Sequence, residues 1–226
     1  MAVLEVVNQS ILPPRALEEA ISLYASNWGE IMRAELHISS DSELRKILIG
    51  QQMIRTDIFP QGQRAVIDKQ TELPFGTINS LLYHSNDLPS VISWNQLTSE
   101  GYHTNHEDDG DSLICVAIQT SARGAARLLV ESQAELAKRL GKRLFVFTRP
   151  NGFEKYLQQH PGTTIEQYLN LLTKDGIVIK DDGVSFHKHI GATLSQRLKD
   201  NKPYLPNSRP GDRSSMFYNV LMEYRP

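Results

Sequence analysis

One stretch decides the fold of this 226-residue chain: Leu113-Ile114-Cys115-Val116-Ala117-Ile118-Gln119-Thr120, followed by Ser121-Ala122-Arg123-Gly124-Ala125-Ala126. The first part is an apolar run typical of a buried strand, and the second is a turn of small residues. An amphipathic helix pattern follows, and a second apolar strand ends at Thr148-Arg149-Pro150. In such a turn phosphate oxygens can reach backbone N–H groups at the positive end of a helix. The stretch therefore predicts an α/β domain that binds a phosphate-bearing ligand.

This order of elements resembles the acyl-CoA-binding core of the GNAT superfamily, in which a (Gln/Arg)-x-x-Gly-x-(Gly/Ala) loop holds the pyrophosphate of coenzyme A. Here the loop reads Ser121-x-x-Gly124-x-Ala126, so Ser121 departs from the pattern, and Arg123 is the candidate replacement for the missing charge. The resemblance implies a GNAT fold: a mixed, mostly antiparallel sheet flanked by helices, with an acyl-CoA cleft at the splayed fourth and fifth strands. It implies that coenzyme A contacts Val116, Ala117, Ile118, Ser121, Ala122, Arg123, Gly124, Ala125 and Ala126.

Length and composition indicate one domain, because 226 residues with 40% hydrophobic content suffice for one large core. We expect N-terminal helices in residues 1–60, the acyl-CoA-binding core in 64–156 and a further half in 157–226. The net charge of -2, with scattered Lys and Arg, gives no basic face for nucleic acid. No long apolar run or basic leader is present, which predicts a cytoplasmic protein without a membrane partner.

Hydrophobic spacing predicts the other elements. Helices are expected over Arg15–Arg33 and, with Asp41 as the cap, from Asp41 to Met53; a hairpin of strands is expected over Arg64–Asp68 and Phe75–Tyr83. Residues 85–111 read as an ordered excursion on the surface. The later expectations are a helix over Thr164–Lys174, a short strand over Gly176–Ile179, a strand or strand and turn over Val184–Thr193, a polar linker over Asp200–Asp212 and a closing strand over Phe217–Tyr224.

The usual catalytic tyrosine of a GNAT N-acetyltransferase has no clear counterpart. That tyrosine lies on the helix after the fifth strand and protonates the thiolate leaving group. Here Arg149-Pro150-Asn151-Gly152 resists immediate helix formation, and the nearest tyrosine is Tyr156. Both a catalytic and a packing role for Tyr156 stay open at this point.

The C-terminal half resembles a narrower group, the GNAT-like domains of polyketide synthase loading modules, which decarboxylate malonyl or methylmalonyl thioesters. This resemblance implies that the active-site residues are Thr148, His187, Arg209 and Trp28. It rests on Trp94-x-x-Leu97-x-x-x-Gly101, His106, Gly110-Asp111, Phe147-Thr148-Arg149-Pro150, Phe186-His187-x-x-x-Gly191-Ala192, Asn207-Ser208-Arg209-Pro210-x-Asp212 and Tyr224.

These residue types suit decarboxylation, which leaves an enolate. Hydrogen-bond donors at the thioester oxygen stabilise that charge, as Thr148 and His187 would, while Arg209 would orient the departing carboxylate and Trp28 would form an apolar wall. Each residue also has a structural alternative. Thr148 can simply end a strand, and His187 can be a histidine whose hydrogen bonds are satisfied within the protein. Arg209 can be a solvated arginine, and Trp28 can serve helix packing. On the expected strand, His189 shares a face with His187 and is its main rival.

Other reactive groups favour no additional site. Cys115 lies within an apolar strand, so we expect a buried thiol rather than a nucleophile. His103 and His106 have no evident third soft ligand, and Glu107–Asp111 lacks the spacing of a calcium loop. We expect no bound metal.

The sequence therefore predicts a decarboxylase of malonyl or methylmalonyl thioesters carried on coenzyme A or on the phosphopantetheine arm of an acyl carrier protein. Transfer of the product acyl group to the carrier, to prime polyketide synthesis, is part of the implied role. An acetyl-CoA-dependent N-acetyltransferase and a non-catalytic acyl-CoA-binding domain are the alternatives. The chain can be a free protein or a domain of a larger synthase.

Overall fold

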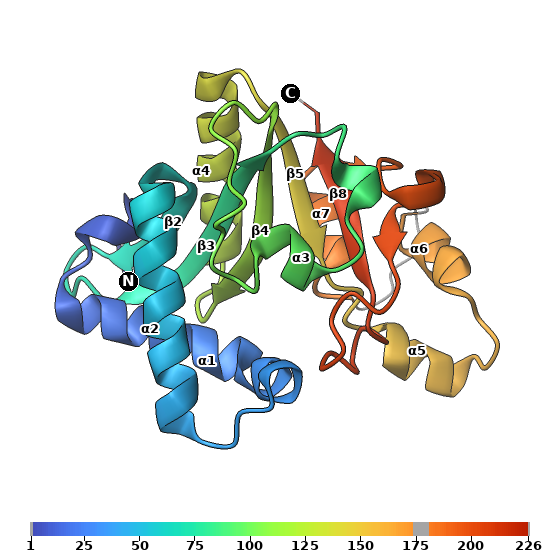
Figure 1. Ribbon diagram of the computed structural model, residues 1–226, viewed down its shortest axis with the longest axis horizontal. Helices are drawn as coiled ribbons and strands as arrows, with labels where there is room; N and C mark the ends of the chain where they lie inside the picture. Colours follow the sequence, from blue (N-terminus) through green and yellow to red (C-terminus); the bar gives the residue numbers. More distant parts are fainter. Residues whose placement is uncertain (1, 174–180, 226) are drawn as a thin grey trace.

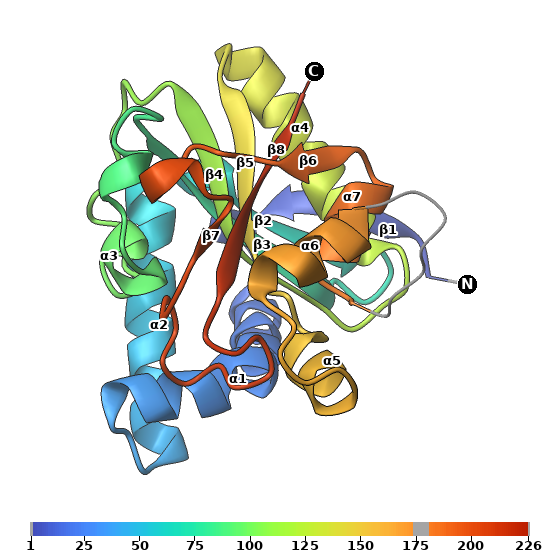
Figure 2. The ribbon, with the colours of Figure 1, turned by 90° about the vertical axis from the view of Figure 1, so that its right-hand side faces the viewer.

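A computed structural model describes residues 2–173 and 181–225. A single twisted sheet runs through the molecule, with helices on both of its faces (Figures 1 and 2). The strand order is β1-β2-β3-β4-β5-β8-β6, and β7 also pairs with β8. Every pair is antiparallel except β4 with β5. This confirms the mixed, mostly antiparallel sheet of the GNAT fold.

The N-terminal half contains the two expected helices and the expected hairpin. Strand β1, which the sequence did not predict, pairs with β2 and adds an edge to the sheet. Both helices are longer than expected. The bounds are β1 Leu4–Asn8, α1 Pro14–Leu36, α2 Asp41–Ile58, β2 Gln63–Asp68 and β3 Pro74–Tyr83, with 3₁₀ turns η1 Gln9–Ile11 and η2 Pro60–Gly62.

The cap of α2 is Ser40 and not Asp41. The Ser40 hydroxyl accepts a hydrogen bond from the backbone N–H of Glu43 at 3.2 Å, which satisfies one of the N–H groups that a helix start leaves free. Asp41 instead occupies the first turn and forms an ion pair with Arg33 of α1. The prediction was wrong by one residue because both residue types cap helices.

Residues 85–111 cover one face of the sheet and are not a surface excursion. They form η3 (Leu88–Ser90) and α3 (Trp94–Thr98). Trp94 and Leu97 are buried against Ile114 and Val116 of the central strand. The composition of the segment is polar, but Leu88, Val91, Trp94 and Leu97 are buried, whereas Ile92 is exposed.

The central unit consists of β4 (Ser112–Thr120), α4 (Ala125–Leu140) and β5 (Arg143–Thr148). Parallel pairing of β4 with β5 runs from Ser112–Arg143 to Cys115–Val146 and then stops. Beyond that point β4 continues for five residues and β5 for two without pairing to each other. The expected splay of these strands is therefore present.

The C-terminal half differs most from expectation. Val184–His189 forms helix α7 rather than a strand, and α5 (Phe153–Gln159) begins immediately after Gly152. The other elements are α6 Ile165–Thr173, β6 Ala192–Leu194, η4 Lys199–Asn201, β7 Tyr204–Leu205 and β8 Asn219–Tyr224, of which α6 and β8 were expected. The expected strand Gly176–Ile179 lies outside the described residues.

Asp181 explains why α7 is helical. Its carboxylate accepts the N–H groups of Gly183 and Val184 at 3.0 and 2.8 Å, which starts the helix, and it also accepts the Gly152 N–H at 3.0 Å. One side chain thus ties the beginning of α7 to the beginning of α5. This tertiary contact overrides the strand propensity of Val184 and Phe186.

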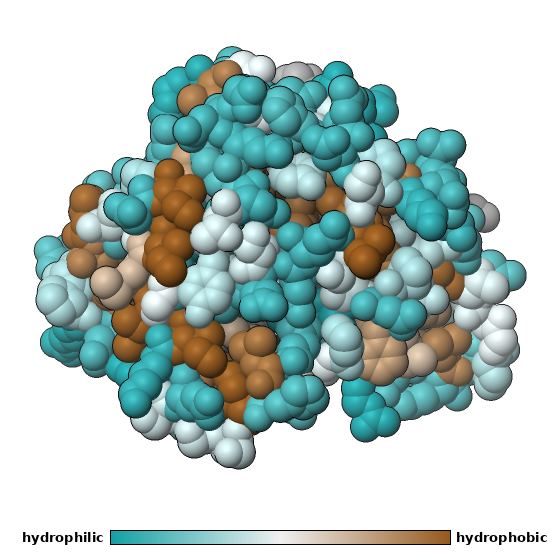
Figure 3. Space-filling view, in the orientation of Figure 1, coloured by the Kyte–Doolittle hydropathy of each residue, from teal (hydrophilic) through white to brown (hydrophobic). Residues whose placement is uncertain are grey.

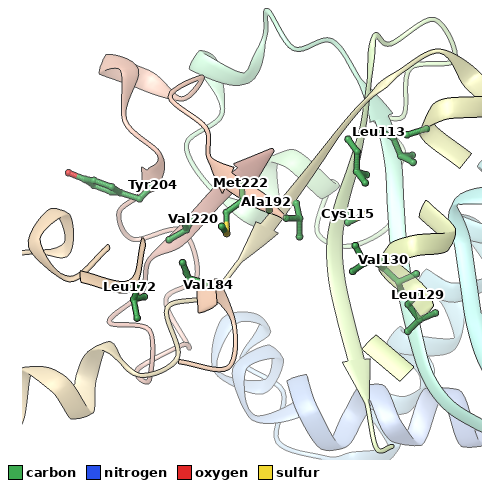
Figure 4. Packing of buried hydrophobic residues seen from close by; sticks show 14 of the residues in the cluster. Leu113, Cys115, Leu129, Val130, Leu172, Val184, Ala192, Tyr204, Val220 and Met222 are labelled. Atoms are coloured by element: carbon green, nitrogen blue, oxygen red, sulfur yellow. The ribbon is translucent and has the colours of Figure 1, made fainter. Parts of the chain in front are cut away.

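The hydrophobic core has a cluster on each face of the sheet. On one face Leu113 and Cys115 of β4 lie beside Leu129 and Val130 of α4 (Figure 4). On the other face Val116 packs with Phe145 and Leu221 beneath α3. Cys115 is 3% exposed, and burial raises the pKa of its thiol, as expected for a structural cysteine.

The outer surface is mostly polar, with apolar patches toward the N-terminal helices on the face shown in Figure 3. The exposed large apolar side chains include Met53 and Ile54 of α2. Within residues 2–173 and 181–225, none of the helices combines the length and the apolar character that a bilayer span requires.

Replacing Gly183 by Ala tests the junction of β5 and α7. A Cβ atom there would lie 2.0 Å from the carbonyl oxygen of Arg149 and 2.9 Å from Oγ1 of Thr148. We expect a loss of about 1–3 kcal/mol in the free energy of unfolding, measured by urea denaturation. Gly50→Ala in α2, where nothing lies within 4 Å, is the control and should not destabilise the protein. Equal stability of both variants would contradict this packing.

Candidate active site

A cleft of about 430 Å³ lies where β4 and β5 diverge. Its walls come from α1, from the unpaired end of β4, from the end of β5 and from α7. Figure 3 shows a notch in the lower outline between the surface over α1 and that over α5. The end of strand pairing therefore leaves a hollow that reaches the backbone of both strands.

Eight residues predicted from the sequence line this cleft, and they come from both halves of the chain. They are Trp28, Val116, Ala117, Ile118, Ala126, Thr148, His187 and Arg209. Ser121, Ala122, Arg123, Gly124 and Ala125 are not part of the lining but form the turn that leads from β4 to the lining residue Ala126.

The turn has an open approach at the beginning of α4. Gly124 has φ of +86°, a conformation that glycine adopts readily, and no atom lies within 4 Å of the position of a Cβ atom there. The Ala125 N–H donates to the carbonyl of Ala122 at 3.3 Å, and the next N–H groups at a helix start have no acceptor within the helix. Arg123 is exposed beside the turn, whereas the Ser121 N–H already donates to the carbonyl of Phe75.

Thr148 and His187 both line the cleft, the first from β5 and the second from α7. Thr148 is the last residue of β5 and is 7% exposed, and its backbone position is fixed by pairing with Val220 of β8. His187 lies on α7 and is 1% exposed. Its Nδ1 lies 2.6 Å from the hydroxyl oxygen of Tyr224.

His187 is neutral at ordinary pH. Burial lowers its pKa from 6.5 to about 4, because a charged ring would lose its hydration. A neutral imidazole offers one donor and one acceptor, so His187 can donate to an oxygen without adding a full positive charge. His189, the expected rival on a strand, is exposed on the helix and is not in the cleft.

Arg209 is buried, which corrects the expectation of a solvated segment. It is 1% exposed and forms two hydrogen bonds with Glu35 of α1, Nε–Oε1 at 3.1 Å and Nη2–Oε2 at 2.9 Å. Its third nitrogen, Nη1, is buried without a hydrogen-bond partner among the described residues. The sequence did not indicate this pair because 174 positions separate the two residues.

Arg149 is a second arginine in the cleft that the sequence analysis did not select. Its Nε lies 2.8 Å from Oδ1 of Asn151 and 3.2 Å from Oδ2 of Asp212. Burial lowers the pKa of Arg149 and Asp212 opposes that shift, so the guanidinium stays charged. The signal that could have identified Arg149 is its position directly after Thr148, at the end of a buried strand.

Both guanidinium groups lie beside the ring of Trp28. Arg209 lies 4.1 Å from the ring centre of Trp94 and 5.0 Å from that of Trp28, and Arg149 lies 4.7 Å from the ring centre of Trp28. The Trp28 indole N–H donates to Oε1 of Gln119 at 3.3 Å. Trp28 is therefore a wall of the cleft as well as part of helix packing.

The remaining candidates lie elsewhere. Tyr156 stacks on His160 and does not line the cleft. His106 stacks on Phe59, and its Nδ1 accepts the Leu82 N–H at 3.0 Å, which gives it a structural role. The packing role is thus the one that the geometry supports for Tyr156.

The pKa of His187 gives a testable dependence of stability on pH. Because the folded pKa, about 4, is below the ordinary 6.5, the unfolded chain binds more protons between these pH values, and the free energy of unfolding rises with pH there. The contribution lost on acidification from 6.5 to 4 is about 3 kcal/mol. Denaturation of the wild type and of His187→Gln across this range should show a shallower slope for the variant. Identical slopes would contradict the assignment.

We compared the chain with known protein families, curated proteins and solved structures. No family model matches the chain. A curated relative, the probable hydrolase YhcX of Bacillus subtilis (strain 168), is 28% identical over 171 residues, which are 74% of this chain; they amount to only 31% of that protein. The chain thus spans about a third of the relative it matches.

Three solved structures have a similar fold over nearly the whole chain. The loading GNATL domain of CurA from Lyngbya majuscula has a TM-score of 0.68 and 20% identity, covering 99% of this chain and 97% of that one. The GphF GNAT-like decarboxylase in complex with isobutyryl-CoA has a TM-score of 0.66 and 17% identity, and the match covers 98% of both chains. The malonyl-CoA decarboxylase of Rhodopseudomonas palustris has a TM-score of 0.52 and 16% identity, and the match covers 98% of this chain and 56% of that one.

The strand order, the parallel pair β4–β5 and these structural matches lead to one conclusion. The chain has the GNAT fold and resembles GNAT-like loading and decarboxylase domains along its length.

Proposed function

We propose that this protein decarboxylates malonyl or methylmalonyl thioesters carried on coenzyme A or on the phosphopantetheine arm of an acyl carrier protein. One observation carries the proposal: a single cleft beside a phosphate-accessible turn contains Thr148, a neutral His187 and two arginines. GNAT-like decarboxylase and loading domains with the same fold support it.

The splayed strands suit the pantetheine arm. Past Cys115, β4 no longer pairs with β5, and although the Val116 carbonyl accepts the Trp94 indole N–H at 2.8 Å, backbone groups farther along β4 would be available to the amides of an extended pantetheine chain. The pyrophosphate of coenzyme A would then lie at the turn from Ser121 to Ala126 and the first N–H groups of α4. The acyl end would reach Thr148 and His187 at the other end of the cleft.

The reaction breaks the carbon–carbon bond between the carboxylate and the α-carbon. The bonding electrons move into the thioester carbonyl and form an enolate, and CO2 departs. The Thr148 hydroxyl and an N–H of His187 stabilise the negative oxygen, which is where oxyanion donors have their largest effect. The enolate carbon then takes a proton from water, since the low pKa of His187 keeps the ring neutral rather than a proton-carrying acid.

The carboxylate of the substrate needs a cation that is not fully occupied. Arg209 uses two nitrogens for Glu35, which leaves Nη1, whereas within the described residues the hydrogen bond of Arg149 with Asn151 and its ion pair with Asp212 both involve Nε. We assign the terminal nitrogens of Arg149 to the carboxylate together with Nη1 of Arg209. The indole of Trp28 beside both groups favours release of uncharged CO2.

Substitution of the two donors tests the chemistry. His187→Gln and Thr148→Val should each lower the rate of CO2 release from a malonyl thioester by about 100-fold or more, because each removes a donor to the enolate oxygen. The assay is intact-protein mass spectrometry of malonyl-loaded acyl carrier protein, with malonyl-CoA in parallel. His189→Gln, an exposed change on the same helix, is the matched control and should retain activity.

The outcomes separate the alternatives. Retained decarboxylation in His187→Gln would contradict the assigned role. Turnover of acetyl-CoA with an amine, and none with malonyl thioesters, would favour the N-acetyltransferase reading, since acetyltransferases also have this fold. Tight thioester binding without turnover would indicate a binding domain.

Replacing Arg149 distinguishes binding of the carboxylate from binding of coenzyme A. Arg149→Gln should weaken the binding of malonyl-CoA by about 10-fold or more while leaving acetyl-CoA binding unchanged, because only malonyl-CoA carries the extra charge. Isothermal titration with both thioesters measures the difference. Arg143→Gln, an exposed arginine at the distant start of β5, is the control. Equal losses for both thioesters would refute the assignment.

A further inference from the structure

His187 has a partner behind it, on the side away from the cleft. The Tyr224 hydroxyl oxygen lies 2.6 Å from Nδ1 of His187, and His187 lines the cleft whereas Tyr224 does not. The two nitrogens of an imidazole lie on different edges of the ring. The edge turned to Tyr224 carries Nδ1, so the ring presents Nε2 to the cleft.

Tyr224 is held by the sheet from both sides. Strand β8 places it opposite Leu144 of β5 and opposite Ala192 of β6. A residue with strand partners on both sides has little freedom to shift, which makes it a rigid support for a catalytic ring. His187 itself lies on a short helix, whose beginning Asp181 anchors.

The direction of the hydrogen bond depends on which partner carries the shared proton. Among the described residues, the Tyr224 hydroxyl makes no other hydrogen bond, so Nδ1 is the acceptor available to its proton. Burial raises the pKa of this hydroxyl, so the proton stays on the oxygen. A neutral ring that accepts at Nδ1 must carry its own proton on Nε2.

We propose that Tyr224 is a positioning residue that donates its hydroxyl proton to Nδ1 of His187 and fixes the ring as the Nε2–H tautomer. His187 then faces the cleft as a hydrogen-bond donor and not as a base. The catalytic consequence rests on the proposed function, because a donor suits an enolate oxygen, whereas the tautomer itself does not depend on any substrate.

The tautomer can be observed directly in the resting protein. In ¹⁵N-labelled protein, long-range ¹H–¹⁵N spectra distinguish protonated from unprotonated imidazole nitrogens, and a difference spectrum with His187→Gln assigns this ring among the seven histidines. We expect a protonated Nε2 and an unprotonated Nδ1. A protonated Nδ1 in the wild type would overturn the proposal whether or not the protein turns over any thioester.

Tyr224→Phe removes the donor and keeps the aromatic ring. We expect a mixture of tautomers at His187 and a fall in kcat for the malonyl thioester of about 10- to 100-fold, the range seen when an outer partner of a functional histidine is lost, with KM little changed. Tyr204→Phe removes a hydroxyl that bonds Glu166, outside the cleft, and should leave both readouts at wild-type values.

The outcomes distinguish this inference from the proposed function. Wild-type kcat and tautomer in Tyr224→Phe would overturn the positioning role. The expected tautomer shift without decarboxylation by the wild type would sustain the role of Tyr224 and remove the proposed reaction. If Tyr224→Phe fails to fold, the wild-type spectrum still decides the tautomer.

Discussion

The end of pairing between β4 and β5 is the constraint on which the rest of the site depends. Up to Cys115 and Val146 the two strands share a regular parallel ladder, and beyond that point they separate. Unpaired backbone inside a protein is costly unless a partner satisfies it. The splay therefore leaves polar groups beside the cleft for a ligand chain, and it places the turn before α4 at one end and the end of β5 at the other.

The charges of the cleft are balanced before any substrate enters. Glu35 pairs with Arg209 and Asp212 with Arg149, and both guanidinium groups lie beside the ring of Trp28. Removing one member of a buried pair leaves an uncompensated charge, which is strongly destabilising. The Glu35–Arg209 pair thus anchors the C-terminal segment to α1, the Arg149–Asp212 pair anchors it to the end of β5, and Nη1 of Arg209 has no hydrogen-bond partner among the described residues. The arginines that line the cleft therefore also hold the C-terminal segment in place.

Local patterns were enough to predict the central unit of the fold but not the C-terminal half of the site. The apolar runs of β4 and β5 and the small turn at Gly124 determine their own structure, so the splayed core was predicted correctly. Helix α7 was missed because Asp181, a residue before it, starts the helix through contacts that also reach Gly152. Arg209 was predicted as an active-site residue, but its burial and its ion pair were not predicted because the partner Glu35 is distant in sequence. Arg149 was missed although it adjoins Thr148.

The most direct test is a crystal structure with a malonyl-CoA analogue whose carboxylate is replaced by a sulfonate, which keeps the negative charge but cannot leave as CO2. We predict that the pantetheine arm lies between the separated ends of β4 and β5, with the acyl carbonyl oxygen within hydrogen-bond distance of Thr148 and His187. An analogue bound elsewhere, or one whose acyl end points away from both residues, would contradict the account.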